Sequence, residues 1–183
     1  MVGFEIALVD SNVVDYALKL PTKDLAVNIL RFVSEKRPIV TSEYVRFEVY
    51  RGLSMSKVPD AKRLLNAFTA LPVDRTIFDI AAALTTCYEC DEQTKQYRAS
   101  FSDGDIIIAA TAFKHKLVVV TANRNDFPAP YFSEVTKHTL RDARNRPIPV
   151  YELKPDIAYL NAMLEVCFPA AANNKRLEKR DGQ

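Results

Sequence analysis

Two short apolar runs without a polar break stand out along the chain, at residues 6–9 (IALV) and 117–120 (LVVV). Uninterrupted apolar runs of this length are typical of strands that are buried on both faces of a parallel sheet. The first run is followed by Asp10, and the second by the polar sequence Thr121-Ala122-Asn123. With a shorter apolar pair at residues 39–40, the pattern predicts parallel strands that end in polar side chains.

Between these runs the apolar positions recur with helical spacing. Residues 23–36 and 60–70 have the pattern of amphipathic helices, and residues 76–96 that of a longer helix. Residues 41–52 and 105–112 predict two more helices, with a loop at residues 97–102 before the second of them. Strands that alternate with helices predict an α/β fold with a parallel sheet.

The last part of the chain has a different pattern. Residues 134–140 and 148–153 flank a polar turn at 141–147, which predicts a β-hairpin. A helix from Pro155 to about Val166 is expected to follow, with the proline at its start. We therefore expect residues 1–132 to form a core, residues 133–170 to be an extension packed on the same domain, and residues 171–183 to be a basic, disordered tail.

Four acidic residues lie where the predicted elements begin or end: Asp10, Glu48, Asp105 and Asp126. Asp10 ends the first strand, in the crevice where open α/β sheets bind ligands. Asp105 begins the inward face of its helix, and Glu48 lies in the middle of an apolar helix face. An isolated buried carboxylate loses much of its hydration energy, so Glu48 on such a face requires a partner.

Each acid also has a local interpretation. Asp10 and Asp105 could be helix N-caps, Asp126 could start a turn, and Glu48 could lie on a solvated face. Converging carboxylates, however, repel one another and raise each other's pKa unless a cation neutralises them. Taken together, the four acids indicate a shared cation.

The types of ligand indicate which ion this would be. Carboxylate oxygens suit Mg²⁺ or Mn²⁺, and no histidine or cysteine lies near these acids in the sequence. Cys87 and Cys90 have the CxxC spacing but lack a second pair or a nearby histidine, and His115 and His138 are isolated, so surface or packing roles are expected for all four. A site of carboxylates and metal ions suits phosphoryl transfer, in which the metal activates water and stabilises charge on the phosphate.

The sequence around the acids resembles the PIN domain, and most closely the VapC-type toxin ribonucleases of prokaryotic toxin–antitoxin pairs. The resemblance spans about residues 4–132. It is carried by VDSN around Asp10, EVYRGL from Glu48, DIIIAATA from Asp105 and TANRNDF around Asp126. Each motif is weak alone, but all four in this order and spacing are specific.

The resemblance implies a three-layer α/β/α sandwich with a central, mostly parallel sheet, and Mg²⁺- or Mn²⁺-dependent cleavage of RNA. By position, Asp10, Glu48 and Asp105 match the metal-site acids of the family. Family members place the fourth acid at either of two positions, which here hold Asn123 and Asp126, and we favour Asp126 as the carboxylate.

The resemblance also implies supporting residues and partners. Thr121 and Asn123 are expected to hold a metal-bound water or a phosphate by hydrogen bonds, with Ser11 and Asn12 beside the site. A homodimer is implied and, for a toxin, an antitoxin that inserts basic residues into the acidic cleft. A housekeeping RNA-processing nuclease and a PIN-like module that binds RNA or protein without cleaving it are the alternatives.

Composition and charge narrow the function classes. The 183 residues, 48% of them hydrophobic, suit one hydrophobic core. The net charge of +2 resides in residues 173–183, which leaves 21 basic and 21 acidic residues elsewhere, so RNA binding needs a local cluster. Candidates for that cluster are Arg46, Arg51, Lys95 and Arg98. Three cysteines suit a reducing cytoplasm, and the sequence predicts neither a signal peptide nor a membrane span.

Two other enzyme classes also place an aspartate at a strand end. A phosphoacceptor receiver domain would require paired acids near the first strand and a lysine after a later strand, which the sequence lacks in recognisable form. A haloacid-type phosphatase would require Asp-x-Asp where this chain has Asp10-Ser11-Asn12. Both are therefore weaker interpretations than a metal-dependent nuclease.

Overall fold

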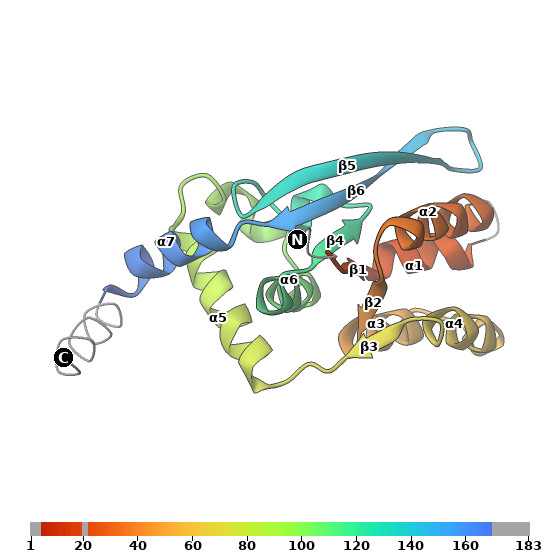
Figure 1. The fold of residues 1–183 in the computed structure, drawn as a ribbon, viewed down its shortest axis with the longest axis horizontal. Helices are drawn as coiled ribbons and strands as arrows, with labels where there is room; N and C mark the ends of the chain where they lie inside the picture. Colours follow the sequence, from red (N-terminus) through yellow and green to blue (C-terminus); the bar gives the residue numbers. More distant parts are fainter. Residues whose placement is uncertain (1–4, 20–21, 170–183) are drawn as a thin grey trace.

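A six-stranded mixed sheet lies at the centre of the computed structural model, which describes residues 5–19 and 22–169, with only the backbone at residues 98–100 (Figure 1). The strand order is β3-β2-β1-β4-β6-β5. The four parallel strands are β1 (Ala7–Val9), β2 (Ile39–Ser42), β3 (Thr69–Leu71) and β4 (Val118–Thr121). Two antiparallel strands, β5 (Phe132–Arg141) and β6 (Pro147–Pro155), complete the sheet.

Helices flank this sheet and form, with it, the three-layer α/β/α architecture that the motifs predicted. They are α1 (Ser11–Leu18), α2 (Lys23–Lys36), α3 (Glu43–Arg51), α4 (Val58–Leu65), α5 (Arg75–Cys90), α6 (Asp103–His115) and α7 (Ile157–Cys167). Short 3₁₀ turns at Met55–Lys57, Lys95–Ser100 and Arg124–Asp126 join some of them. None of the helices in residues 5–19 and 22–169 has the length and apolar character required to cross a membrane.

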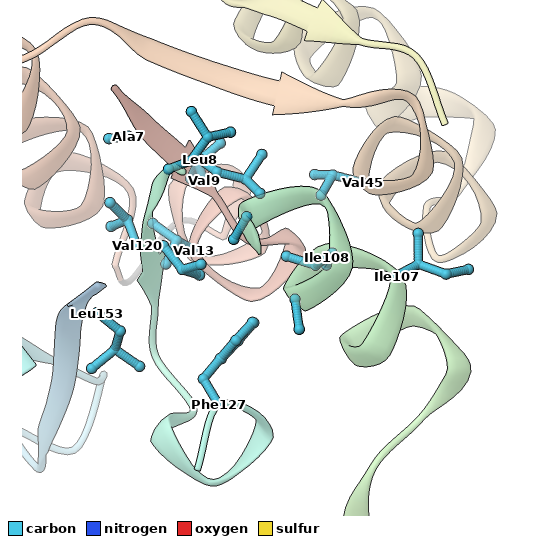
Figure 2. Packing of buried hydrophobic residues seen from close by; sticks show 14 of the residues in the cluster. Ala7, Leu8, Val9, Val13, Val45, Ile107, Ile108, Val120, Phe127 and Leu153 are labelled. Carbon is cyan, nitrogen blue, oxygen red and sulfur yellow. The ribbon is translucent and has the colours of Figure 1, made fainter. Parts of the chain in front are cut away.

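Helix α6 is the most deeply buried helix, because it is apolar on every side. Every residue from Ile106 to Phe113 is buried, and the alanines among them leave room for the helix to lie close to its neighbours. Figure 2 shows Ile108 of α6 facing a core that includes Val9, Val120 and Phe127. The core thus fixes the start of α6 relative to the ends of β1 and β4.

The order of the strands creates a crevice between β1 and β4. The chain proceeds from β1 outward to β2 and β3, and then returns to add β4 on the other side of β1. At such a reversal the connections that leave the two strands diverge, which opens a ligand site at the carboxyl ends of the strands. Asp10 and Thr121 lie at the ends of these two strands.

The C-terminal hairpin prediction is confirmed, and the strands are longer than expected, at 132–141 and 147–155. Strand β6 pairs with β4 and therefore places the hairpin within the main sheet. The following helix begins at Ile157, with Asp156 as N-cap accepting a hydrogen bond from Tyr159 N. Pro155 ends β6, so its expected role at the helix start is wrong.

Other predicted boundaries also differ. The helix expected at 60–70 ends at Leu65, and Thr69–Leu71 form the edge strand β3, which is too short and too exposed to give a clear apolar pattern. The helix expected to reach residue 96 ends at Cys90, because the Asp91 side chain accepts from Gln93 N and Tyr159 Oη and closes a turn. The expected loop at 97–102 begins as a 3₁₀ turn. Helix α1 has no counterpart among the predicted elements, and residues 171–183 lie outside the described residues.

Candidate active site

Asp10 is the most buried acid of the proposed site, with 1% of its surface exposed. It occupies the N-cap position of helix α1, as the local interpretation expected, but its side chain makes no capping hydrogen bond. Instead its Oδ2 atom accepts hydrogen bonds from Asn12 Nδ2 and Thr121 Oγ1, both at 2.7 Å. Asp10 is therefore directed across the crevice toward β4.

The supporting residues predicted around Asp10 hold the two strand ends together. Asn12 Nδ2 also donates to Thr121 Oγ1 at 3.1 Å, and its Oδ1 accepts from Ala122 N at 2.9 Å. Thr121 Oγ1 in turn accepts from Asn123 N at 3.0 Å. These contacts join the ends of β1 and β4 and fix the Asp10 carboxylate, while Ser11 Oγ lies 3.3 Å from Asp10 Oδ1.

Glu48 enters the site from α3 and is half-buried. Burial raises the pKa of Glu48, a hydrogen bond from Ser11 lowers it, and the negative charge of Asp105 raises it further. The side chain also lies against the first turn of α6, where a Cβ atom on Gly104 would be 2.4 Å from Glu48 Oε1 and 2.8 Å from Tyr44 Cε1. Gly104 thus allows Glu48 to approach the backbone of α6.

Asp105 combines a structural role with its place in the site. Ser102 is the N-cap of α6, and Asp105 completes a capping box with it, since Asp105 Oδ2 accepts from Ser102 N at 2.8 Å and from Ser102 Oγ at 2.7 Å. The suggestion that Asp105 is itself the N-cap is therefore wrong, although its capping function is real. Its carboxylate also acts on its neighbours, because its charge raises the pKa values of Asp10, Glu48 and Asp126.

Asp126 lies within the acidic cluster, and Asn123 positions it. Asp126 is 7% exposed, and its Oδ1 accepts a hydrogen bond from Asn123 Nδ2 at 2.8 Å. Burial, followed by the charges of Asp105 and Asp10, raises the pKa of Asp126 to about 7. The fourth carboxylate is thus in reach of the other acids, and the Asn123 amide serves as its hydrogen-bond donor.

The electrostatics of the four acids fit a cation-binding site. Burial, opposed by the Thr121 hydrogen bond, raises the pKa of Asp10 to about 6, and the charges of Asp105 and Glu48 add to the increase. Among the residues that the structure describes, no lysine or arginine forms an ion pair with Asp10, Asp105 or Asp126. Oxygen ligands that raise one another's pKa are the donor set that suits Mg²⁺ or Mn²⁺.

The acids are nevertheless not arranged as a closed metal cage. In the described part of the chain, no three Asp, Glu, His or Cys side chains converge tightly enough to hold a metal ion. The hydrogen bonds explain this, since Asp10 is directed to Asn12 and Thr121, and Asp105 is directed back to Ser102. Binding an ion here would require small rotations of these carboxylates.

Gly104 is the site feature that the sequence argument missed. It is one of only four glycines in the chain and lies in the first turn of a helix, where glycine is unfavourable. An unfavoured glycine directly before a candidate metal-site acid is a signal of close backbone approach. The basic candidates do not all lie beside the acids. Arg51 does, since its charge lowers the pKa of Glu48. Arg46 bonds Asn66, Lys95 pairs with Glu92, and the Arg98 side chain lies outside the described residues.

Comparison with known families identifies this architecture. The sequence profile of the PIN domain matches residues 7–133 of this chain. The chain belongs to the PIN-domain family. PIN domains are generally nucleases that use divalent metal ions, and the match includes all four acids but ends at the beginning of the β5–β6 hairpin.

Solved structures agree with this assignment. A toxin–antitoxin complex from Klebsiella pneumoniae is similar at 25% identity with a TM-score of 0.50, covering 68% of this chain and 92% of that chain. FitAcB from Neisseria gonorrhoeae is similar at 26% identity with a TM-score of 0.50, covering 66% and 90%. FitAB bound to an IR36 DNA fragment shares the fold at 22% identity and a TM-score of 0.52, covering 66% and 87%.

These similarities confirm the resemblance to VapC-like PIN domains that the motifs indicated. No curated protein matches the chain. About a third of the PIN-domain chain lies outside the match to the Klebsiella structure.

Proposed function

We propose that this PIN domain is a divalent-metal-dependent endoribonuclease and the toxin of a toxin–antitoxin pair. The observation that carries the proposal is the pair of buried acids, Asp10 and Asp126, whose pKa values are raised to about 6 and about 7 with Asp105 beside both. Such a cluster is unfavourable at neutral pH without a cation. Its position at the strand ends is where α/β folds bind ligands.

Asp10, Glu48, Asp105 and Asp126 would hold Mg²⁺ or Mn²⁺, and the bound metal would supply an activated water and stabilise charge on a phosphodiester. The residues around the acids have distinct tasks. Thr121 and Asn12 orient Asp10, Ser102 orients Asp105, and Asn123 orients Asp126. Hydrogen bonds of this kind hold metal-binding carboxylates in place and affect metal affinity.

The similar solved structures support one proposed partner. The similar structures from Klebsiella and Neisseria support an antitoxin as partner, because the former is a toxin–antitoxin complex. An antitoxin that inserts a basic side chain between Asp10 and Asp126 would neutralise the cluster in place of the metal. We further propose a homodimer, a cytoplasmic location and RNA as the substrate. Induction of the chain should then arrest growth, and the product of an adjacent small gene should relieve the arrest.

A cleavage assay tests the nuclease proposal. We expect the purified chain to cut single-stranded RNA with Mg²⁺ or Mn²⁺ and to lose this activity in EDTA. Asp105→Asn should lower the rate by about 10³-fold, of the size seen when one group that stabilises a transition state is removed. The Asn side chain can still accept from Ser102, so the helix cap is retained.

The matched control is Asp103→Asn. Asp103 is exposed in the same helical turn, and this substitution removes the same charge. Its cleavage rate should remain within a few-fold of the wild type. Equal activity in Asp105→Asn and wild type, or undiminished cleavage in EDTA, would remove the catalytic assignment.

A further inference from the structure

The β5–β6 hairpin projects beyond the edge of the sheet where the acids lie. Strand β6 is antiparallel to β4, with Val119 opposite Leu153 and Thr121 opposite Tyr151. Residues 147–150 therefore continue past the carboxyl end of β4, and the turn at 141–147 lies further out in the same direction. Figure 1 shows this turn reaching over α2, on the side toward which the β4 arrow points.

Lys19 and Thr22, which follow α1 and precede α2, lie on the same side as the hairpin turn. An open groove of about 480 Å³ separates these residues from the hairpin turn. Tyr16, Lys19 and Thr22 form one wall, and the other wall consists of Asp142, Ala143, Arg144 and Arg146. We call this the tip groove. Helix α1 starts directly after Asp10, and Tyr16 is the first of its residues to line the tip groove, so the groove begins about 9 Å from Asp10 along this helix.

The tip groove is positively charged. Its lining includes three basic side chains, Lys19, Arg144 and Arg146, and one acidic side chain, Asp142, for a net charge of +2. The Arg144 guanidinium has no hydrogen-bond or ion-pair partner in the described part of the chain. Lys19 has a single ion pair among the described residues, with Asp15 at 3.4 Å, and its ammonium lies 5.6 Å from the centroid of the Tyr16 ring. Both cations are therefore available to an anionic ligand.

The hairpin turn is held in one conformation. Asp142 Oδ1 accepts from Arg144 N at 2.9 Å and from Arg146 N at 2.8 Å, and Asp142 Oδ2 accepts from Arg146 Nε at 2.7 Å. Arg141 Nη1 donates to Asn145 O at 3.0 Å and ties the other side of the turn. Because Asp142 is used within the turn, it opposes a bound anion less than its charge alone suggests.

We propose that the tip groove binds the sugar-phosphate backbone of single-stranded RNA and leads the strand to the acids. The proposal deepens the nuclease function and rests on it for the identity of the polymer. Charge complementarity favours this occupant, since an acidic cluster alone repels RNA and a basic groove on the same edge supplies the missing attraction. Tyr16 adds an aromatic ring at the groove, of the type on which unpaired bases stack.

Binding measurements with paired variants test this proposal. Lys19→Gln/Arg144→Gln removes two cations without touching the side-chain contacts that hold the turn. Arg63→Gln/Arg75→Gln is the matched control, because these side chains are 81% and 94% exposed on α4 and α5, away from the tip groove. The affinity of the full-length chain for a labelled single-stranded oligoribonucleotide is measured in EDTA by fluorescence anisotropy, across about 50 to 200 mM salt.

We expect the tip-groove pair to bind about tenfold more weakly at low salt. The slope of log K against log salt should become shallower by about 1.4, because each lost contact to a single-strand phosphate contributes about 0.7. The control pair should keep the wild-type affinity and slope. Unchanged binding in the tip-groove pair, or an equal loss in the control pair, would overturn the proposal and leave the groove to an acidic protein or to no ligand.

A cleavage assay with metal separates this proposal from the nuclease assignment. If both hold, the tip-groove pair should raise KM for RNA about tenfold and leave kcat close to the wild-type value. Metal-dependent cleavage with an unchanged KM would overturn the tip groove alone. RNA binding that depends on the tip groove, without any cleavage in the wild type, would remove the nuclease function alone.

Discussion

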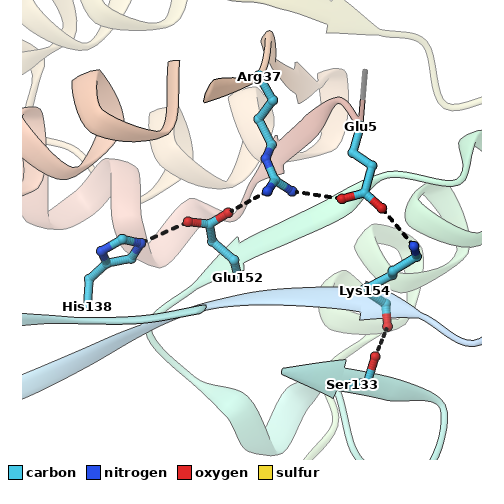
Figure 3. A network of polar contacts seen from close by, with 6 residues as sticks. All are labelled: Glu5, Arg37, Ser133, His138, Glu152 and Lys154. Atoms are coloured by element: carbon cyan, nitrogen blue, oxygen red, sulfur yellow. Dashed lines mark hydrogen bonds and ion pairs between the residues drawn. The ribbon is translucent and has the colours of Figure 1, made fainter. Parts of the chain in front are cut away.

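Two buried carboxylates on the same sheet have opposite surroundings. Glu152 on β6 is fully buried, and the chain surrounds it with cationic and hydrogen-bonding groups, since its Oε2 lies 3.4 Å from Arg37 Nη2 and its Oε1 lies 2.8 Å from His138 Nε2 (Figure 3). Asp10, directly after β1, is almost as buried, but among the described residues its side chain accepts only from the neutral donors Ser11, Asn12 and Thr121, with the acid Asp105 nearby. The chain thus balances the negative charge of Glu152 with a cation and leaves the charge of Asp10 without one.

This is the difference we expect between a structural carboxylate and one that binds an exchangeable cation. Glu152 is part of a fixed network, because Arg37 also contacts Glu5 at 3.3 Å and Lys154 contacts Glu5 at 2.7 Å. This network ties α2, the start of β1 and the hairpin together. A permanent cation beside Asp10 would exclude an exchangeable one, so a metal site has to leave its acids unpaired at a cost in stability.

The largest effect is expected from removing the internal cation. Arg37→Met leaves Glu152 buried with only His138, and breaking a buried pair in this way costs about 3 to 5 kcal/mol. Chemical denaturation at neutral pH measures the free energy of unfolding. A free energy of unfolding close to that of the wild type would contradict the assignment of Arg37 as the cation that balances Glu152.

Two controls sharpen this measurement. Arg63→Met removes an exposed arginine that pairs only with exposed Asp60, and its cost should stay within about 0.5 kcal/mol. Adding Glu152→Gln to Arg37→Met should recover most of the loss, because the stranded charge is then gone. A double variant as unstable as Arg37→Met alone would assign the loss to packing of the arginine stem.

The next effect is the pH dependence of the metal-free chain. The pKa of Asp10 is about 6 in the folded state, whereas that of an ordinary aspartate is 3.8. The folded state therefore binds this proton more tightly than the unfolded state. The associated stability is complete below about pH 4 and is lost as pH rises through 6 and, with Asp126, through 7. For Asp10 alone the loss is about 3 kcal/mol, at 1.36 kcal/mol per pKa unit.

Thermal melts between about pH 5 and 8 measure this loss, and Asp10→Asn provides the control. In the variant, the part of the decrease in melting temperature that Asp10 causes should be absent. The difference in melting temperature between wild type and variant should therefore widen toward pH 8. Mg²⁺ or Mn²⁺ should raise the melting temperature of the wild type at pH 8 and have little effect at pH 5, where Asp10 and Asp126 hold protons. Parallel curves for the two proteins would contradict the assignment of Asp10 as an uncompensated acid.

The same contrast explains what the sequence could predict. The four candidate acids were recognisable from local patterns, because Asp10 directly follows an apolar strand, Glu48 interrupts an apolar helix face, Asp105 begins one, and Asp126 lies in the polar stretch after the second apolar run. Glu152 was not recognisable, since its partners come from residues 37 and 138, and His138 was expected to have only a surface or packing role. In the structure His138 is half-buried and contacts both Glu152 and the Phe32 ring.

The fold shows the same division. The parallel strands and the hairpin were predictable from apolar runs and a polar turn, whereas β3 was missed because three half-exposed residues at a sheet edge carry no distinct period. Gly104 was missed because its reason lies on another helix, in Glu48. Long-range contacts of this kind leave no regular spacing in the sequence.

The smallest effect concerns the fourth position of the site. Asp126→Asn removes a carboxylate that interacts with Asp105 and Asp10, and we expect the cleavage rate to fall about 100-fold, similar to the loss of one stabilising group.

Asn123→Ala removes only the donor to Asp126 Oδ1, and we expect the cleavage rate to fall about tenfold, as for a group that orients a ligand. In the wild type the hydrogen bond from Asn123 lowers the pKa of Asp126. Asn123→Ala should therefore raise this pKa and shift the rise of the pH–rate profile to higher pH. Rates across pH with saturating Mn²⁺ distinguish the two roles, and a greater loss in Asn123→Ala than in Asp126→Asn would make Asn123 the metal-site residue.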